Sequence, residues 1–205
     1  MKINAFCTSD PIKALGSCDK VIYCGRSSFE GPEIVGCDLF VGDNTGDIYL
    51  PSILDEGFED ACDYLVTNNK KMFVRAAYDL NEAGLIESRY KLSPIMLLHK
   101  MGVLKQCTVV GGVCLDNDDL DLMAQEGVPL VVTPTSSAGY GYGFAPVCAA
   151  RKRGIRVGLG TFDGKYNKSL SLDYEAEFLL MTCNAEMRTE NSLSQTDLQS
   201  ILEFM

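Results

Sequence analysis

The sequence predicts an α/β fold with a mostly parallel sheet, which is either an open doubly wound sheet or an incomplete (β/α) barrel. From about residue 70 onward, apolar runs of strand length alternate with helical segments of roughly 10 to 15 residues, the pattern of βαβ units. The chain has 205 residues, enough for one well-buried domain. About six strands are recognisable, whereas a closed barrel needs eight and typically about 250 residues.

The second half of the chain reads as a regular series of strands and helices. Ser93 and Pro94 are typical of a helix start, and Gly127 follows an apolar periodic segment in the position of a helix end. We expect strands at 71–78, 107–115, 129–136 and 155–161, and helices at 93–102, 117–127, 145–154, 171–187 and 194–205.

The first 70 residues are less regular. We expect strands at 19–24 and 37–43 and a helix at 50–69. No linker or internal repeat separates this part from the rest. We therefore expect one domain over residues 1–205, with an irregular part at 1–70 and a regular part at 71–205.

Composition and charge narrow the class of protein. Hydrophobic residues make up 46% and charged residues 22%, the profile of a soluble globular protein, and the formal net charge is -10. An acidic chain without a dense basic patch argues against nucleic-acid partners and against anionic membranes. No stretch approaches the roughly 18 apolar residues of a membrane span. The nine cysteines never form CxxC, so we expect reduced, mostly buried thiols and a cytoplasmic protein.

Several motifs of the second half resemble one known family in order and spacing. They are PTSS (134–137), GFAPV (143–147), RKRGIRVGLGT (151–161) and the helix start SLD (171–173). Together with the segment YKLSPIMLLHKMGVL, they resemble the later half of the amidohydrolase superfamily, in its chlorohydrolase and deaminase branch. The resemblance runs from about Met72 to about Leu202. It implies a partial or distorted TIM-like (β/α) barrel with mostly parallel strands.

The metal ligands of that family do not carry over. Its members bind a catalytic metal through histidines on several strands and the aspartate of a GTD motif, and the metal activates a water molecule. By resemblance, the strand-five and strand-six histidines fall near Arg75 and Gly111, the following glutamate falls near Tyr78, and the histidine of the HCPTS motif aligns with Val132. Phe162 stands where the aspartate of GTD is expected. The sequence contains a single histidine, His99, within a predicted helix. We therefore expect no bound metal and no cofactor.

Arg75 and Asp163 are the candidate catalytic residues if any chemistry survives. Arg75 interrupts an apolar strand, and burying its charge unpaired is costly, so it must meet a carboxylate, a ligand or solvent. We expect a salt bridge with Asp43 or Asp163, or alternatively a ligand. Asp163 follows Phe162, and a shift of one residue turns a side chain to the opposite face unless a bulge re-aims it.

Candidate ligand-binding residues lie at the ends of the last two predicted strands. In complete barrels the loops after strands seven and eight often bind phosphate. The glycine- and tyrosine-rich loop 136–144 would let backbone and aromatic rings approach a ligand. The candidates are Thr133, Ser136, Tyr140, Tyr142, Thr161 and Phe162.

Three functions remain open from the sequence. The first is a truncated amidohydrolase-like protein that has lost metal-dependent hydrolysis and serves binding or assembly. The second is a hydrolase acting on C–N bonds through a remodelled site with Asp163, Arg75 and perhaps Asp43, or one completed by another chain. The third is a binding protein for a small anion or a nucleobase-like molecule. Because an incomplete barrel exposes two sheet edges, we also expect a homo-oligomer, most simply a dimer.

Overall fold

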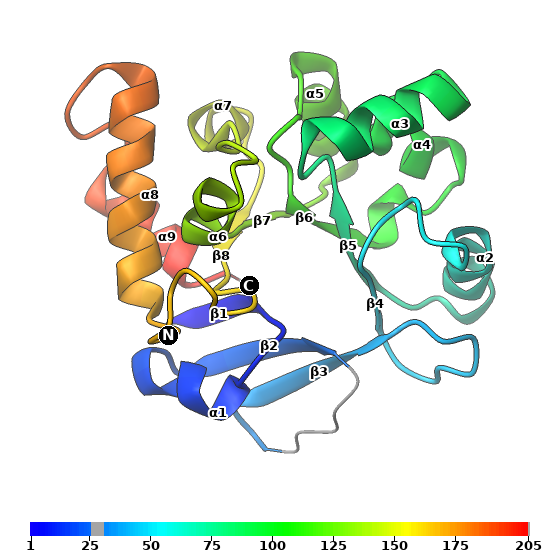
Figure 1. Ribbon diagram of the computed structural model, residues 1–205, viewed down its shortest axis with the longest axis horizontal. Helices are drawn as coiled ribbons and strands as arrows, with labels where there is room; N and C mark the ends of the chain where they lie inside the picture. Colours follow the sequence, from blue (N-terminus) through cyan, green and yellow to red (C-terminus); the bar gives the residue numbers. More distant parts are fainter. Residues whose placement is uncertain (26–30, 205) are drawn as a thin grey trace.

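The computed structural model describes residues 1–25 and 31–204, and it contains one sheet of eight parallel strands. The strands follow one another around a ring in chain order, from β1 to β8, with helices outside it (Figure 1). This arrangement is a nearly closed barrel and confirms the predicted α/β, TIM-like fold class. The expected count of about six strands was too low. The eight strands are β1 (Ile3–Cys7), β2 (Lys20–Gly25), β3 (Ile34–Leu39), β4 (Ile48–Leu50), β5 (Met72–Ala76), β6 (Cys107–Gly111), β7 (Leu130–Val132) and β8 (Val157–Leu159).

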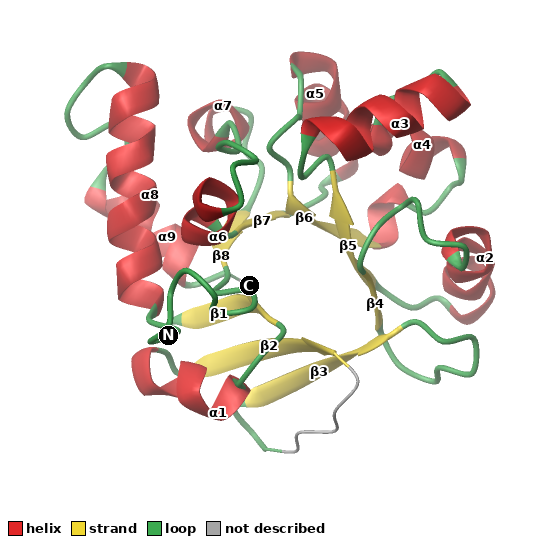
Figure 2. Ribbon diagram, in the orientation of Figure 1, coloured by secondary structure: helices red, strands yellow, loops and turns green. Residues whose placement is uncertain are grey.

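The helices are unevenly spread around the barrel (Figure 2). Most of them follow β4 to β8, and the segment between β3 and β4 contains none. They are α1 (Pro11–Ala14), α2 (Phe58–Asn68), α3 (Leu80–Tyr90), α4 (Pro94–Lys100), α5 (Asn117–Glu126), α6 (Pro134–Gly139), α7 (Val147–Lys152), α8 (Leu172–Met187) and α9 (Gln195–Leu202), with single 3-10 turns at Leu15–Ser17 and Leu104–Gln106.

The barrel closes through backbone contacts just beyond the end of β8. The Phe162 N–H donates to the Phe6 carbonyl at 3.0 Å, and the Thr8 N–H donates to the Phe162 carbonyl at 3.0 Å. A parallel bridge therefore joins Cys7 to Phe162. The two edges that an incomplete barrel would expose are paired here, which removes the reason for which a dimer was expected.

The N-terminal part supplies four of the eight strands. The predicted strand at 37–43 lies at 34–39, where Val21 to Gly25 of β2 pair with Ile34 to Asp38. Strand β1 was not predicted. The expected helix at 50–69 begins only at Phe58, because Ile48–Leu50 forms β4 between β3 and β5.

Alternating side chains divide the core into two layers, as the two-residue period of a strand requires. On β5, Met72, Val74 and Ala76 pack outward against the helices. Phe73 packs inward with Phe6 and other side chains of the barrel interior. Arg75 lies on the same face of β5 as Phe73, so the strand delivers it to the carboxyl end of the barrel interior.

Helix ends follow the sequence signals closely. Ser93 caps α4 by accepting from the Met96 N–H at 3.1 Å, with Pro94 as the first helical residue. Asp116 caps α5 in the same way, and α5 ends at Gly127 in the left-handed conformation. The predicted strand at 129–136 was too long, because Pro134 starts the short helix α6 instead of continuing β7.

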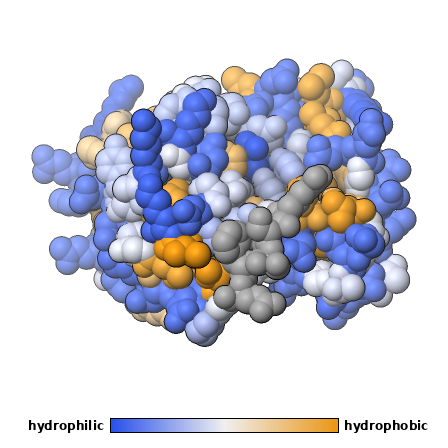
Figure 3. Space-filling view, turned by 60° about the horizontal axis from the view of Figure 1, so that its bottom comes forward, coloured by the Kyte–Doolittle hydropathy of each residue, from blue (hydrophilic) through white to orange (hydrophobic). Residues whose placement is uncertain are grey.

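The surface shown in Figure 3 does not expose a broad apolar face. It is the side that carries α1 and β3, and polar residues cover most of it, with separate smaller hydrophobic areas between them. All nine cysteines are free thiols and most are buried, as expected. Within the described ranges, no helix has the length and apolarity needed to cross a membrane.

Candidate functional site

Arg75 lies at the carboxyl end of the barrel, surrounded by aromatic rings. Its guanidinium carbon is 4.0 Å from the centre of the Tyr78 ring and 4.8 Å from the centre of the Phe162 ring. Contacts of this kind are attractive because the ring faces carry partial negative charge. No carboxylate of the described residues forms an ion pair with Arg75, so the expected salt bridge with Asp43 or Asp163 was wrong.

Phe162 is held in this place by an unusual backbone conformation. Its φ angle is 53°, in the left-handed region that side chains other than glycine rarely adopt. The ring stacks on Phe6 with centres 5.7 Å apart and planes 12° apart. The backbone turn thus directs an aromatic ring toward the barrel interior, at the position where the resembled family has its metal-binding aspartate.

Gly111, at the end of β6, leaves no room for a side chain. A β-carbon there would lie 2.6 Å from the Tyr78 β-carbon, and the glycine φ angle is 101°. Tyr78 therefore fills the space in which a strand-six ligand would stand. A histidine at this position would need both a different backbone conformation and a different placement of Tyr78.

These groups line a small pocket at the barrel mouth. The pocket encloses about 260 Å³ including its open side, and its inner space is much narrower. That inner space holds roughly one water. The lining consists of Phe6, Arg75, Tyr78, Val110, Gly111, Thr133, Ser136, Ser137, Tyr140, Tyr142 and Phe162.

Six of the eight predicted site residues meet in this pocket. Among them Ser136 is notable, because it is 1% exposed and its Oγ has no hydrogen-bond partner among the described residues. A buried hydroxyl without a partner is unfavourable. The two predicted site residues outside the pocket lining are Asp163 and Thr161.

Asp163 accepts hydrogen bonds from its own loop and from Tyr140, which follows α6. One carboxylate oxygen accepts from the Tyr140 hydroxyl, and the other accepts from the Lys165 N–H at 3.0 Å. The hydrogen bond to Asp163 is the largest cause that raises the pKa of Tyr140, to about 12. Lys165 also lies over the Tyr140 ring, with its ammonium 4.5 Å from the ring centre. Asp163 thus orients Tyr140 at the rim of the pocket.

Thr161 serves the closure of the barrel. It is fully buried, and its hydroxyl accepts from Asn4 Nδ2 at 2.8 Å, while its N–H donates to Asn4 Oδ1 at 3.2 Å. This pairing joins β1 to the segment after β8. Asn4 and Phe6 were not singled out from the sequence, because β1 was not recognised as a strand.

The described residues offer no set of side chains suited to a metal ion. No group of three or more His, Cys, Asp or Glu side chains within residues 1–25 and 31–204 is arranged for one. His99 is exposed on α4, away from the barrel mouth.

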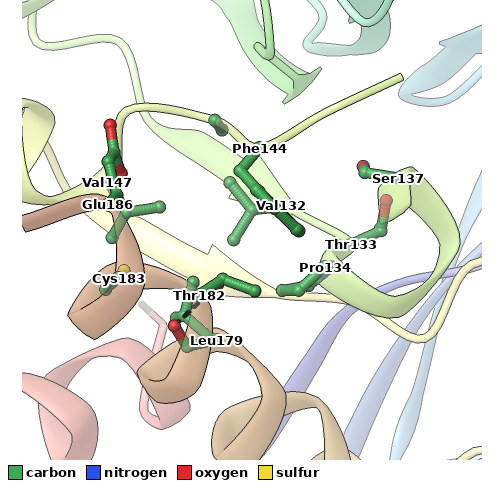
Figure 4. A pocket seen from close by; sticks show the side chains of 11 residues that line it. Val132, Thr133, Pro134, Ser137, Phe144, Val147, Leu179, Thr182, Cys183 and Glu186 are labelled. Atoms are coloured by element: carbon green, nitrogen blue, oxygen red, sulfur yellow. Dashed lines mark hydrogen bonds between the residues drawn. The ribbon is translucent and has the colours of Figure 1, made fainter. Parts of the chain in front are cut away.

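A second pocket lies between β7, α8 and the loop after α6 (Figure 4). Leu179, Thr182 and Cys183 of α8 face Val132 and Phe144 across a space of about 300 Å³, which includes open solvent. Val132 therefore faces the helix layer, although it aligns with a histidine of the resembled family. Apart from Glu186, the lining carries no charged group, so this pocket lacks the convergent polar groups of the barrel mouth.

The fold is a TIM-like barrel with its candidate site at the carboxyl ends of the strands. Solved structures with this architecture include an adenosine deaminase from Xanthomonas campestris with bound zinc, at 18% identity and a TM-score of 0.69, covering 85% of this chain and 40% of that one. Another is the atrazine chlorohydrolase TrzN from Arthrobacter aurescens in complex with zinc, at 15% identity and a TM-score of 0.70, covering 89% of this chain and 47% of that one.

Curated proteins with a similar sequence are the second comparison. It is 30% identical over 105 residues to a 5-methylthioadenosine/S-adenosylhomocysteine deaminase of Caldicellulosiruptor saccharolyticus, which covers 51% of this chain and 24% of the relative. It is 37% identical over 93 residues to the enzyme of the same name from Halothermothrix orenii, covering 44% and 21%. No protein-family model matches the chain. Over about half of its length the chain is thus similar to these deaminases, and the match spans about a quarter of the length of those relatives.

Proposed function

We propose that this chain is an amidohydrolase-like barrel that binds a small ligand at its mouth and does not carry out metal-dependent hydrolysis. The observation that carries the proposal is the identity of the groups at the former ligand positions. They are the guanidinium of Arg75, the glycine backbone of Gly111 and the ring of Phe162. The same three residues line the pocket.

The chemistry of these groups does not fit a zinc ion. Zinc in proteins is held by imidazole nitrogen, thiolate sulfur or carboxylate oxygen. A guanidinium carries a positive charge and has no acceptor, and a phenyl ring offers no lone pair. The nearby carboxylate of Asp163 accepts hydrogen bonds from Tyr140 and Lys165. We therefore assign no step to a metal.

A ligand-binding role is supported by the composition of the pocket. Five aromatic rings contribute to its wall, with one cation and the hydroxyl side chains of Thr133, Ser136 and Ser137 between them. Pockets with mostly apolar walls and a few converging polar groups are typical binding sites. The remodelled hydrolase with Asp163 and Arg75 is less well supported, because Asp163 lies outside the pocket lining.

The assay that tests this proposal combines activity and binding on the same preparation. With zinc added, we expect no deamination of 5-methylthioadenosine or adenosine above a buffer blank. In a thermal-shift screen of small ring compounds, a ligand at 100 times its dissociation constant should add about 2.7 kcal/mol of stability. Zinc-dependent turnover would contradict the proposal.

We also propose, separately from ligand binding, that the chain forms a homodimer and has a role in assembly. Light scattering at micromolar concentration tests the dimer. A mass of one chain would exclude it under those conditions.

A further inference from the structure

We infer that the barrel-mouth pocket is a carboxylate site, in which the Arg75 guanidinium and the Ser136 hydroxyl hold the anionic head group of a small, flat ligand. The inference rests on the proposed binding function and adds the chemical class of the ligand. Two independent features carry it, one from Arg75 and one from Ser136.

The first feature is the way in which Arg75 is held. A guanidinium donates hydrogen bonds in its own plane. The guanidinium carbon lies 4.0 and 4.8 Å from the ring centres of Tyr78 and Phe162, and the guanidinium forms a side-chain hydrogen bond with Tyr49. Rings and one phenol cannot use all five N–H groups of an arginine, so N–H groups are left for an acceptor. The neighbouring phenol of Tyr49 does not neutralise the charge, because burial raises the pKa of Tyr49 far above its ordinary value, against the opposing effect of Arg75.

The second feature is the hydroxyl of Ser136. It is almost completely buried, lines the same pocket, and has no hydrogen-bond partner among the described residues. It comes from the first turn of α6, an element separate from β5. A ligand oxygen in the pocket would accept a hydrogen bond from this hydroxyl and relieve its desolvation.

The shape and charge of the lining favour a carboxylate. No aspartate or glutamate lines the pocket, so Arg75 is its charged group. The planar fork of an arginine matches the two oxygens of a carboxylate. The inner space, of about the size of one water, admits one oxygen of a head group, and the rings of Tyr140 and Tyr142, stacked with centres 5.5 Å apart, line the same pocket. These rings offer a flat contact to a ring attached to the carboxylate.

Isothermal titration of the whole chain with benzoate and with benzamide tests the inference. The two probes have the same shape and differ in charge. Benzoate should therefore bind at least about tenfold more tightly if the Arg75 guanidinium pairs with its carboxylate. Arg75→Met should remove this preference. Ser136→Ala should weaken benzoate binding about three- to tenfold without loss of stability, since it deletes a hydroxyl that has no protein partner. Arg156→Met is the matched control, because the exposed Arg156 precedes β8 at the opposite end of the barrel and should leave binding unchanged.

The outcomes separate this inference from the proposed function. Equal binding of benzoate and benzamide, with both weakened by Phe162→Ala, would overturn the carboxylate assignment and leave ligand binding at the mouth intact. Benzoate binding that survives both Arg75→Met and Ser136→Ala would also overturn it. If neither probe binds at millimolar concentration, the carboxylate assignment is wrong, and zinc-dependent deamination in the same preparation would remove the proposed function as well. Should Arg75→Met fail to fold, Ser136→Ala with both probes still decides.

Discussion

Glu82 gives the sharpest prediction about stability, because a buried carboxyl supports the wall of the pocket. It is 1% exposed at the start of α3, and accepts from Ser52 Oγ at 3.1 Å and from the Tyr78 N–H at 3.4 Å. Burial is the largest cause of its shift and raises its pKa from 4.5 to about 7, while these two hydrogen bonds and the charge of Arg75 oppose the rise. The perturbation is Glu82→Gln, which keeps the shape of the neutral carboxyl.

The sign and size of the effect follow from the raised pKa of Glu82. Between its unfolded pKa of 4.5 and its folded pKa of about 7, the folded protein keeps a proton that the unfolded chain releases. The stability that the protonated Glu82 carboxyl contributes is therefore complete below about pH 4.5 and is lost as the pH rises through about 7. A shift of this size corresponds to about 3 kcal/mol of unfolding free energy. For a chain of this length, this corresponds to roughly 6 to 12 °C in melting temperature.

Urea unfolding of the wild type and of Glu82→Gln at a series of pH values measures this effect. The unfolding free energy of the variant, relative to that of the wild type, should rise by up to about 3 kcal/mol between about pH 4 and pH 8. Glu56→Gln, at an exposed carboxyl of the loop before α2, is the control and should give a flat difference. Parallel pH profiles for Glu82→Gln and wild type would refute the raised pKa of the buried Glu82 carboxyl.

Two further predictions concern the packing of the mouth. In a denaturant titration, Gly111→Ala should destabilise the protein by about 2 kcal/mol or more, because the new β-carbon would lie 2.6 Å from Tyr78 and the backbone has a positive φ angle. Gly84→Ala is the control, since Gly84 lies in α3 with open space around it. This variant should be neutral or stabilising by up to about 1 kcal/mol. Asp163→Asn should move the titration of Tyr140 from about pH 12 toward its ordinary value, observed by NMR of labelled tyrosine, and an unchanged titration would contradict the role given to that hydrogen bond.

The second half of the barrel was predictable because each strand there is a continuous apolar run between clear helix signals. Strands β5 and β6 and helices α4, α5 and α8 lie close to their expected ranges. Strand β4 was missed because it has only three residues and runs directly into the turn before α2. Strand β1 was missed because its five residues include the polar Asn4, whose side chain pairs with Thr161 from the far end of the chain.

The sequence predicted that several candidate residues lie together at strand ends, but it did not predict how they contact one another. Arg75, Ser136, Tyr140 and Phe162 were expected at strand ends, and they do meet. The contact of Arg75 with a ring instead of a carboxylate depends on the left-handed backbone of Phe162, which no local sequence signal indicates in a residue other than glycine. The unpartnered hydroxyl of Ser136 depends on packing around α6, so it too required the structure.

The metal content of the purified protein tests the central claim most directly. The protein should be prepared without chelators or a histidine tag, from cells grown with added zinc, and analysed for zinc by mass spectrometry against protein concentration. We predict far less than one zinc per chain, and no change on addition of benzoate. Zinc close to one per chain, displaced or reduced by substitutions at Phe162 or Asp163, would contradict the proposal that the barrel mouth binds a small ligand and no metal.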